Sequence, residues 1–452
     1  MRTSLFLILF LLRTCTSWEW NIPPVSGGLP SARAGHTMSA LSSLDKSVLC
    51  GGQNNEGMYI AGCYELSPLE NWKFKQVIGE TETAPRSDHT ALVYESNMTE
   101  VLILYGGITN QTMMRSTGKY NNFDDNECEI FSTKSWSKIE QADCDVSNAP
   151  ASRYAHSATL ILVEKIWVIF GGFHTDRSGL DNVIQGLDLS NFPQLKWRKG
   201  PSSTIVPFPP PRAYHAAATF TKGNESYMII SGGQGEFNEF YRDIWIFGPI
   251  KGGSRFVQGE WSSPKLDDFA PILYGHKVVL VGATLYSFGG TSPPASGVYT
   301  LDMSVLVETN SVSWVALKSA GTSPQAMFRS SITYIDADGS ADLELLIFGG
   351  STVGENPMCL GILSVLTSAG GGNSVSRLNI AAILGGSTAA VILIGIGLWL
   401  LLKNSNKSRL DRLKNDPAFD NRTYQTSYLI GDDSETFDDS EKEELDETLK
   451  FY

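Results

Sequence analysis

Short apolar runs separated by turn residues occupy most of this chain. The stretch 212–261 shows the pattern in full. Its parts, in order, are Arg212 and His215, apolar runs at 216–220 and 227–230, the pair Gly232 and Gly233, a third apolar run at 244–247, and Trp261. Runs of this length between turn residues predict four antiparallel β-strands. One such sheet cannot bury both of its faces, so we expect the chain to repeat it.

Pairs of glycines recur about every 60 residues along the chain. They stand at 51/52, 106/107, 171/172, 232/233, 289/290 and 349/350. Four copies begin with an Arg and a His three residues apart, which are Arg33/His36, Arg86/His89, Arg153/His156 and Arg212/His215. The fifth copy keeps His276, with Leu273 in the Arg place, and the sixth aligns Gln325 and Phe328 there.

A tryptophan follows every glycine pair except the last. These residues are Trp72, Trp136, Trp197, Trp261 and Trp314. The missing one lies at the other end of the chain, where Trp18 or Trp20 precedes a turn-rich stretch at 23–34. We therefore predict that the N-terminal segment supplies the outer strand of the sixth sheet and so closes a ring of sheets.

This compound repeat resembles that of the kelch-repeat β-propellers, and the resemblance covers residues 18–367. It implies an all-β disc of six radially arranged sheets, or blades, which usually binds a partner on one face and only occasionally is an enzyme. The glycine pairs suit places where φ is positive or where a side chain would collide. The tryptophans are expected to fill the space between neighbouring sheets.

The two ends of the chain carry targeting features. A charged start, a short apolar centre and small residues predict a cleaved signal peptide at 1–17. Residues 378–402 form an uncharged apolar run long enough for a transmembrane helix, and basic residues after it predict that the C-terminal side is cytoplasmic. We expect a flexible stalk at 368–377 and a disordered acidic tail at 403–452.

The full predicted fold class is therefore an all-β six-bladed kelch-type propeller, closed by its N-terminal strand, with one transmembrane helix and a disordered tail. This organisation predicts a single-pass type I membrane protein of the cell surface or of an endomembrane of the secretory route. The propeller would be extracellular or lumenal. Small residues at helical spacing in the apolar run would permit a homodimer.

Several residues suit modification in such a protein. Asn97, Asn110 and Asn224 lie in glycosylation sequons. An oxidising compartment favours disulfides, and we expect a Cys128–Cys144 bridge in preference to a Cys50–Cys63 bridge, with Cys359 free. Tyr424, Tyr428, Thr436 and Ser440 are phosphorylation candidates in the tail, where a cytoplasmic adaptor could bind.

The histidines at the blade starts could be read as metal ligands gathered around the ring axis. A residue that recurs at one place in every blade is better explained as structural, with its ring bonded to the backbone of a neighbouring strand. We therefore assign no metal, no cofactor and no catalytic residue. Nucleic acid is not expected as a partner, because the chain has a formal net charge of −13.

Binding is expected on the face that carries the loops after the second strands, because function commonly lies on loops over a rigid scaffold. The loops of blades two to four are long and rich in Arg, Tyr and Phe, as binding hot spots are. The candidates are Arg115, Lys119, Tyr120, His174, Arg177, Glu236, Phe237, Glu239, Tyr241 and Arg242.

Two functions stay open from the sequence. In one, the chain is a receptor-like or adhesive membrane protein whose propeller binds an extracellular protein or glycan, and whose tail serves trafficking or signalling. In the other, the propeller is a membrane-anchored enzyme that acts on carbohydrate, similar to kelch-fold oxidases or to an epimerase. Only His174 lies outside the repeat, so a copper site made of two His and two Tyr would be short of ligands.

Overall fold

The structure is a computed structural model that describes residues 17–369 with gaps. The gaps are 44, 97–98, 110–127, 140–142, 146–147, 177, 202–206, 252–258, 267–269, 291–296, 305–310, 321–323, 325–326, 336–343, 353–360 and 362. The predicted signal peptide apart from Ser17, the apolar run at 378–402 and the tail with its four phosphorylation candidates lie outside the described residues.

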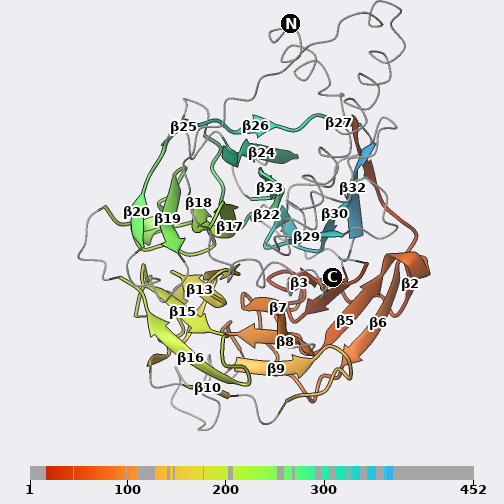
Figure 1. Cartoon of the computed structure of the whole chain (residues 1–452). Coiled ribbons are helices and arrows are strands. Elements are labelled where there is room, and N and C mark those ends of the chain that lie inside the picture. Colours follow the sequence, from red (N-terminus) through yellow and green to blue (C-terminus); the bar gives the residue numbers. More distant parts are fainter. Residues whose placement is uncertain are drawn as a thin grey trace, which may run out of the picture. The chain divides into compact units, whose positions relative to one another are not determined.

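Six β-sheets surround a common centre in chain order (Figure 1). Blade 1 contains β3 (Thr37–Ala40), β4 (Ser47–Cys50), β5 (Cys63–Ser67) and β6 (Lys73–Ile78). Blade 2 contains β7 (Thr90–Ser96), β8 (Thr99–Tyr105) and β9 (Cys128–Ser132), and blade 3 contains β12 (Ser157–Ile161), β13 (Ile166–Phe170), β15 (Ile184–Asp188) and β16 (Gln194–Lys199).

The other three blades follow the same order. Blade 4 contains β17 (Ala216–Lys222), β18 (Glu225–Ser231), β19 (Ile244–Lys251) and β20 (Glu260–Ser262). Blade 5 contains β22 (Lys277–Val281), β23 (Thr284–Phe288), β24 (Val298–Asp302) and β26 (Val315–Ala316). Blade 6 contains β29 (Ser331–Ile335), β30 (Glu344–Phe348), β32 (Leu363–Ala369) and β1 (Ser17–Asn21). The six-bladed all-β prediction is confirmed.

The N-terminal strand closes the ring, as predicted. β1 pairs antiparallel with β32, with Trp18 opposite Ser368 and Trp20 opposite Leu366. Trp18 and Trp20 are both buried and pack on Tyr286 and Phe288 of blade 5. On its other side β1 pairs with β27 (Ser319–Ala320), so both edges of this strand are hydrogen-bonded to a neighbouring strand.

The predicted fold class is corrected on one point. Among the residues that the structure describes, we find no helix whose length and apolar character would let it cross a membrane. The described fold is the propeller without a transmembrane helix.

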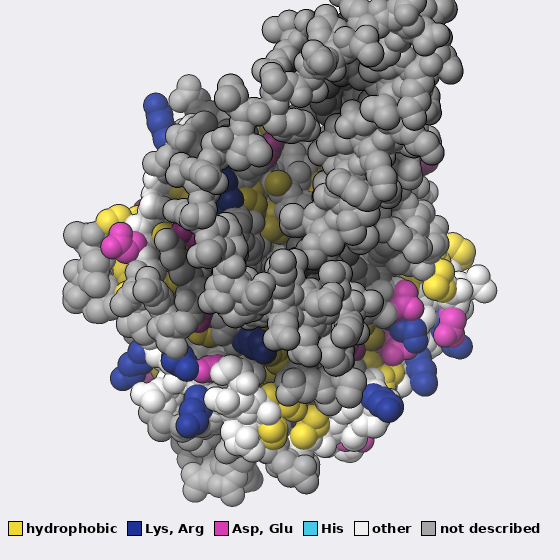
Figure 2. Space-filling model, viewed as in Figure 1, with side chains coloured by type: hydrophobic (Ala, Val, Ile, Leu, Met, Phe, Trp, Pro, Cys, Tyr) yellow, Lys and Arg dark blue, Asp and Glu magenta, His cyan; other side chains and the backbone are white. Residues whose placement is uncertain are grey.

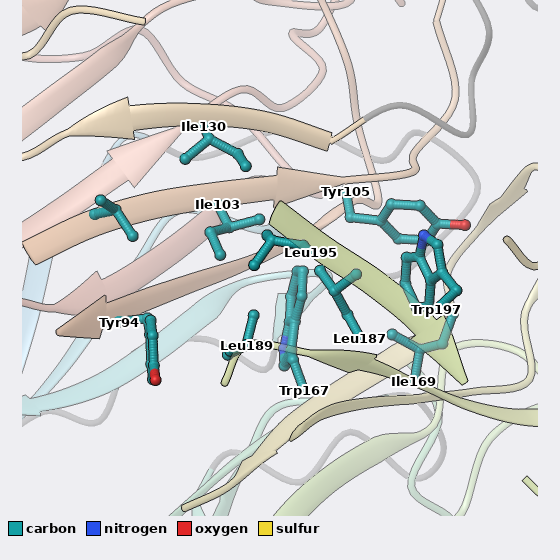
Figure 3. Packing of buried hydrophobic residues seen from close by; sticks show 11 residues of the cluster. Tyr94, Ile103, Tyr105, Ile130, Trp167, Ile169, Leu187, Leu189, Leu195 and Trp197 are labelled. Carbon is teal, nitrogen blue, oxygen red and sulfur yellow. The ribbon is translucent and has the colours of Figure 1, made fainter. Parts of the chain in front are cut away.

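Aromatic side chains fill the space between blades, as the tryptophan spacing predicts. Trp197 of blade 3 lies on Tyr105 of blade 2, with ring centroids 4.8 Å apart, among the apolar side chains drawn in Figure 3. Trp261 of blade 4 lies in the same way on Phe170 of blade 3, at 5.0 Å. In blade 1 the ring contact is made by Phe74, which lies 5.6 Å from Phe348 of blade 6, while Trp72 packs partly buried against the same cluster.

Both glycines of every pair have positive φ. The first glycine also lies too close to the next blade to carry a side chain, since a Cβ on Gly171 would be 2.6 Å from the Arg212 carbonyl oxygen. The second glycine donates its N–H to that same carbonyl. Around the ring these bonds are Gly52 to Arg86 (2.8 Å), Gly107 to Arg153 (2.9 Å), Gly172 to Arg212 (2.8 Å), Gly233 to Leu273 (2.8 Å), Gly290 to Met327 (3.0 Å) and Gly350 to Arg33 (2.8 Å).

This ring of bonds corrects the alignment of the sixth copy. Met327, not Gln325, stands in the Arg place of blade 6, because its carbonyl accepts the bond from Gly290. The His place is then taken by Ser330 rather than Phe328. Gln325 itself lies outside the described residues.

The repeated arginines are structural. Arg153 donates to the carbonyl oxygens of Ala151 at 3.0 Å and of Gly171 at 2.9 Å, and it forms an ion pair with Asp181 at 2.8 Å. The other three also bond to the first glycine of their own blade. These bonds are Arg33 to Gly51 (2.9 Å), Arg86 to Gly106 (3.1 Å) and Arg212 to Gly232 (2.8 Å).

The repeated histidines are also structural, although their partner differs from the expected backbone. Nε2 of His215 is hydrogen-bonded to the hydroxyl of Ser157 in the preceding blade, at 2.7 Å. The imidazoles therefore hold one blade to the next. Among the described residues, no three His, Cys, Asp or Glu side chains gather as a metal site would require.

One disulfide is described in full, between Cys50 and Cys63. These residues are direct cross-strand neighbours in β4 and β5, so the register that the sequence left open brings their side chains together. Cys128 is also in a disulfide. The side chains of Cys144 and Cys359 lie outside the described residues, so the Cys128–Cys144 bridge stays a prediction.

Candidate functional site

Six residues, one at the start of each blade, form a second ring of backbone hydrogen bonds around the axis. Each has positive φ and donates its N–H to the carbonyl of its counterpart in a neighbouring blade, at 2.7–2.9 Å. In chain order they are Gly35, Asp88, Ala155, Tyr214, Gly275 and Arg329. We call these six residues the axial ring. Four of them are not glycine, and left-handed backbone at non-glycine residues is often found at functional sites.

The axial ring lies on the loop face. In five blades the residue just before the ring position pairs with the start of the loop after the second strand, as Tyr154 does with Phe173 and Ser87 with Ile108. Loops after the second strands and links between blades therefore meet around the axis. This is the face on which the sequence predicts binding.

One side of the axial ring is polar and charged. Arg329 reaches past blade 1 to Asp88, with Nε to Oδ1 at 2.8 Å and Nη2 to Oδ2 at 2.5 Å. It also donates to Ser87 Oγ at 2.7 Å. Gly35 makes this contact possible, because a Cβ there would lie 2.5 Å from Arg329 Nη2.

The other side is aromatic. Tyr214 lies at the centre of a group of rings from blades 3 to 6. The centroid distances are 5.3 Å for Tyr154–Phe173, 6.0 Å for Phe173–Tyr214, 5.4 Å for Tyr214–Tyr274, 5.3 Å for Tyr214–Phe328 and 4.8 Å for Tyr274–Phe328. We call the axial ring together with Tyr154, Phe173, Tyr274 and Phe328 the axial cluster.

Burial sets the protonation of the phenols in this cluster. It raises the pKa of Tyr214 well above its usual value, with the charge of Asp88 adding to the effect. Burial likewise raises the pKa of Tyr274 to about 12. Both hydroxyls therefore keep their protons at neutral pH and can donate hydrogen bonds to a ligand.

The blade-4 loop stands beside the aromatic side. Phe237, in the short 3-10 helix η3 (Glu236–Asn238), has 97% of its surface exposed and a φ of 56°. Phe240, at 42% exposure, packs on Tyr274 with centroids 5.1 Å apart. A fully exposed phenylalanine next to partly buried aromatic rings is typical of a binding surface.

The structure separates the predicted binding residues into two groups. Glu236, Phe237 and Glu239 lie in the exposed blade-4 loop, and Arg242 donates to the Ala270 carbonyl at 3.2 Å. Tyr241 and His174 have structural contacts instead. Tyr241 lies under the Arg212 guanidinium at 4.3 Å, and His174 Nε2 is 3.6 Å from Asp181. Arg115, Lys119, Tyr120 and Arg177 lie outside the described residues.

The sequence reasoning missed the axial cluster. Asp88, Tyr214 and Arg329 stand directly before the His place of their blades, so a position-by-position comparison of the repeats would have shown that this place varies. Charged side chains of both signs are otherwise scattered along the rim of the described surface in Figure 2.

No family model matches the chain. The chain is 25% identical over 293 residues to Kelch domain-containing protein 3 of Homo sapiens, covering 61% of this chain and 68% of that protein. It is 25% identical over 289 residues to Host cell factor homolog hcf-1 of Caenorhabditis elegans, covering 61% of this chain and 33% of that protein. It is also 24% identical over 235 residues to Dynein alpha chain, flagellar outer arm, of Chlamydomonas reinhardtii.

The kelch-named relative and the six-bladed ring agree with the repeat pattern. The chain is a six-bladed β-propeller that is similar to kelch-repeat proteins. Kelch propellers generally bind protein partners, so protein binding is the function that this kelch propeller indicates. The match spans 33% of the host cell factor homolog and 5% of the dynein chain, so what those whole proteins do does not transfer to this chain.

Proposed function

We propose that this kelch propeller is the binding part of a receptor-like or adhesive protein, and that it takes an extracellular or lumenal protein partner at the axial cluster and the blade-4 loop. The observation that carries the proposal is Phe237, whose apolar side chain is 97% exposed in the loop whose Phe240 packs on Tyr274 of that cluster. Burying it against a partner would release about 1.5–3 kcal/mol. The acidic tail would then link the bound partner to trafficking or signalling.

The polar side of the axial cluster supports specificity. Asp88 and Arg329 satisfy each other, but the phenols of Tyr214 and Tyr274 remain protonated donors beside them. A partner therefore meets aromatic surface, hydrogen-bond donors and one fixed ion pair within one small area. Aromatic residues and arginine dominate the energy of protein interfaces.

The disulfide supports the compartment that we propose. Cys50–Cys63 and the bridged Cys128 fit an oxidising environment such as the outside of the cell or the lumen of the secretory route. We therefore propose the expected location, with the propeller on the extracellular or lumenal side of a membrane. The alternative, a propeller enzyme acting on carbohydrate, is favoured by no observation among the described residues.

Partner capture by the full-length chain tests the binding face. Proximity labelling on living cells would compare the wild type with Phe237→Ala. The control is Leu162→Ala, which removes a side chain of 50% exposure from the β12–β13 turn on the opposite face. We expect Phe237→Ala to lose specific partners at least tenfold and the control to keep them. Equal partner sets in all three proteins would overturn the proposed face. Capture that depends only on the glycans of the labelled proteins would show that the ligand is a glycan rather than a protein.

Glycosylation tests the compartment separately. Asn224 is exposed in the turn between β17 and β18, where a glycosyltransferase can reach it. We expect glycosidase treatment to lower the mass of the wild type, and Asn224→Gln to lose one glycan. A wild-type chain without any glycan at Asn97, Asn110 and Asn224 would contradict the proposed location.

A further inference from the structure

Five of the six junctions between blades are closed near the axis by the same pair of groups. A hydroxyl from one blade is hydrogen-bonded to the histidine Nε2 of the next. The pairs are Ser331–His36 (2.7 Å), Thr37–His89 (3.1 Å), Thr90–His156 (2.9 Å), Ser157–His215 (2.7 Å) and Ser231–His276 (2.8 Å). In the last pair Ser231 replaces its cross-strand neighbour Ala216, which has no hydroxyl.

The junction between blades 5 and 6 has neither the hydroxyl from the earlier blade nor the histidine from the later one. Lys277 begins β22 at the place that Thr37, Thr90, Ser157 and Ser331 hold in their strands, and Ser330 stands in the His place opposite. The smaller serine leaves room. A Cβ on Gly51, Gly106 or Gly171 would lie 2.7–2.9 Å from the imidazole Cε1 of the next blade, whereas on Gly289 it would be 3.5 Å from Ser330 Oγ.

Within the part of the chain that the structure describes, neither group at this junction has a partner. Ser330 is fully buried, and its Oγ has no hydrogen bond. The Lys277 ammonium forms no hydrogen bond or ion pair among the described residues, and burial lowers its pKa. Lys277 begins the innermost strand of its blade, and its charge lowers the pKa of the histidine in each of the five blades that carry one, its own included.

The charges around Lys277 do not balance. The charged groups that act on it are Asp88 and Arg329, and these two already form an ion pair with each other. Among the described residues, one positive charge near the axis is therefore left without an acid. A half-buried ammonium attracts a nearby anion, and a buried hydroxyl without a partner is costly. Lys277 is only half-buried, so a small solute can reach it.

We propose that the junction of blades 5 and 6 binds one carboxylate anion at the axis, held by the Lys277 ammonium and the Ser330 hydroxyl. A carboxylate has two acceptor oxygens for these two donors and supplies the single missing negative charge. The site lies beyond the axial ring at the level of the histidines. It does not depend on whether Phe237 contacts a partner.

Thermal unfolding of the full-length protein tests the site with acetate as the probe. Acetate replaces fluoride at constant ionic strength. We expect a saturable rise in Tm for the wild type, because a ligand that binds only the folded state stabilises it. The rise should disappear in Lys277→Met and weaken in Ser330→Ala. A wild type that does not respond to acetate, or a Lys277→Met protein that responds as the wild type does, would overturn the proposal.

A double variant covers the case in which Lys277→Met folds poorly. Lys277→Thr with Ser330→His would rebuild the hydroxyl–imidazole pair found at the other five junctions. We expect it to fold, to have a Tm at least equal to that of the wild type in fluoride, and to ignore acetate. An acetate response equal to that of the wild type in this protein would show that the anion binds elsewhere.

The carboxylate could be a free metabolite or a side chain of the bound protein. Partner capture separates these sources. If Lys277→Met loses the partners that Phe237→Ala loses, the carboxylate belongs to the partner. If Lys277→Met keeps the partners while losing the acetate response, the site binds a free anion. Failure of the carboxylate site would then leave the proposed partner-binding face unaffected, and the reverse also holds.

Discussion

Blades 1 to 4 and blades 5 and 6 form the same backbone ring with different side chains. In the first group a buried arginine precedes each histidine by three residues, whereas Leu273 and Met327 occupy that place in the second group, buried to 2% and 1% exposure. The backbone bond that the place accepts is unchanged, at 2.8 Å for Leu273 and 3.0 Å for Met327. The glycines and the carbonyl that they meet therefore define the repeat, and the arginine is an addition to it.

Some of the repeated arginines also form buried ion pairs with a neighbouring acid. Arg153 and Asp181 form an almost fully buried pair, and Arg86 forms one with Glu129 at 2.7 Å. Buried ion pairs are often no more stabilising than apolar residues of similar size, although breaking one of them is costly. Leu273 and Met327 are examples of the apolar solution within the same molecule.

The largest expected effect comes from copying blade 6 into blade 3. Arg153→Met should lower the free energy of unfolding by about 3–5 kcal/mol, because Asp181 is left buried without its cation. Asp181→Asn in the same chain should recover at least half of the loss, since asparagine keeps the acceptor for the Val183 N–H (2.7 Å) without the charge. Chemical denaturation measures both. A double variant as unstable as the single one would show that the arginine acts by packing alone.

Glycine substitutions should affect the two groups of blades equally. Gly171→Ala and Gly289→Ala would place a Cβ 2.6 Å and 2.3 Å from a backbone carbonyl oxygen of the next blade, at positive φ. Each should cost on the order of 3 kcal/mol, including about 1–2 kcal/mol for the left-handed backbone.

The matched control for these two variants is Gly223→Ala. It has a φ of +60° but no atom within 4 Å of the new Cβ, so it should show the backbone cost alone. Chemical denaturation of the three proteins separates strain from collision. Equal losses in all three would mean that contact with the next blade is not what requires glycine.

The smallest effect is a difference in pH dependence. Burial lowers the pKa of His215 well below 6.5, and that of His276 to about 3. Below pH 6.5 each histidine binds a proton in the unfolded chain but not in the folded one. The free energy of unfolding therefore falls as the pH falls, by about 1.4 kcal/mol per pH unit for each histidine. His215→Gln should therefore show a slope shallower by that amount between pH 6 and about 4.5. Denaturation midpoints across this range measure it, and parallel slopes would contradict the neutral buried ring.

Much of the architecture could be predicted from residues that act locally. The glycine pairs, the short apolar runs and the tryptophans, with the sixth one at the N-terminal end, predicted the six blades and the closing strand. Each of these features depends on the backbone or packing of its own repeat. The sixth blade was misaligned since Met327 and Ser330 share no chemistry with arginine and histidine. Phe74 makes the aromatic contact with blade 6 that the tryptophan spacing assigned to Trp72.

The candidate site was harder to predict. Phe237 and its loop were found because they are long and contain aromatic residues. Asp88, Tyr214, Tyr274 and Arg329 were not, because they lie far apart in the chain and single positions in a repeat look like ordinary variation. The Cys50–Cys63 bridge was ranked second for lack of the strand register, which the pairing of β4 with β5 supplied.

The sequence by itself determined the number of blades, the place of every glycine pair and the strand that joins the two ends of the ring, because these follow from local backbone requirements that repeat. The tertiary structure alone decided which side chains meet at the axis. The six turns follow one another at intervals of about 60 residues, and the first and the last, Gly35 and Arg329, become neighbours only because ring closure makes the last blade adjacent to the first. The ion pair of Arg329 with Asp88, and the influence of both charges on Lys277, exist only for that reason.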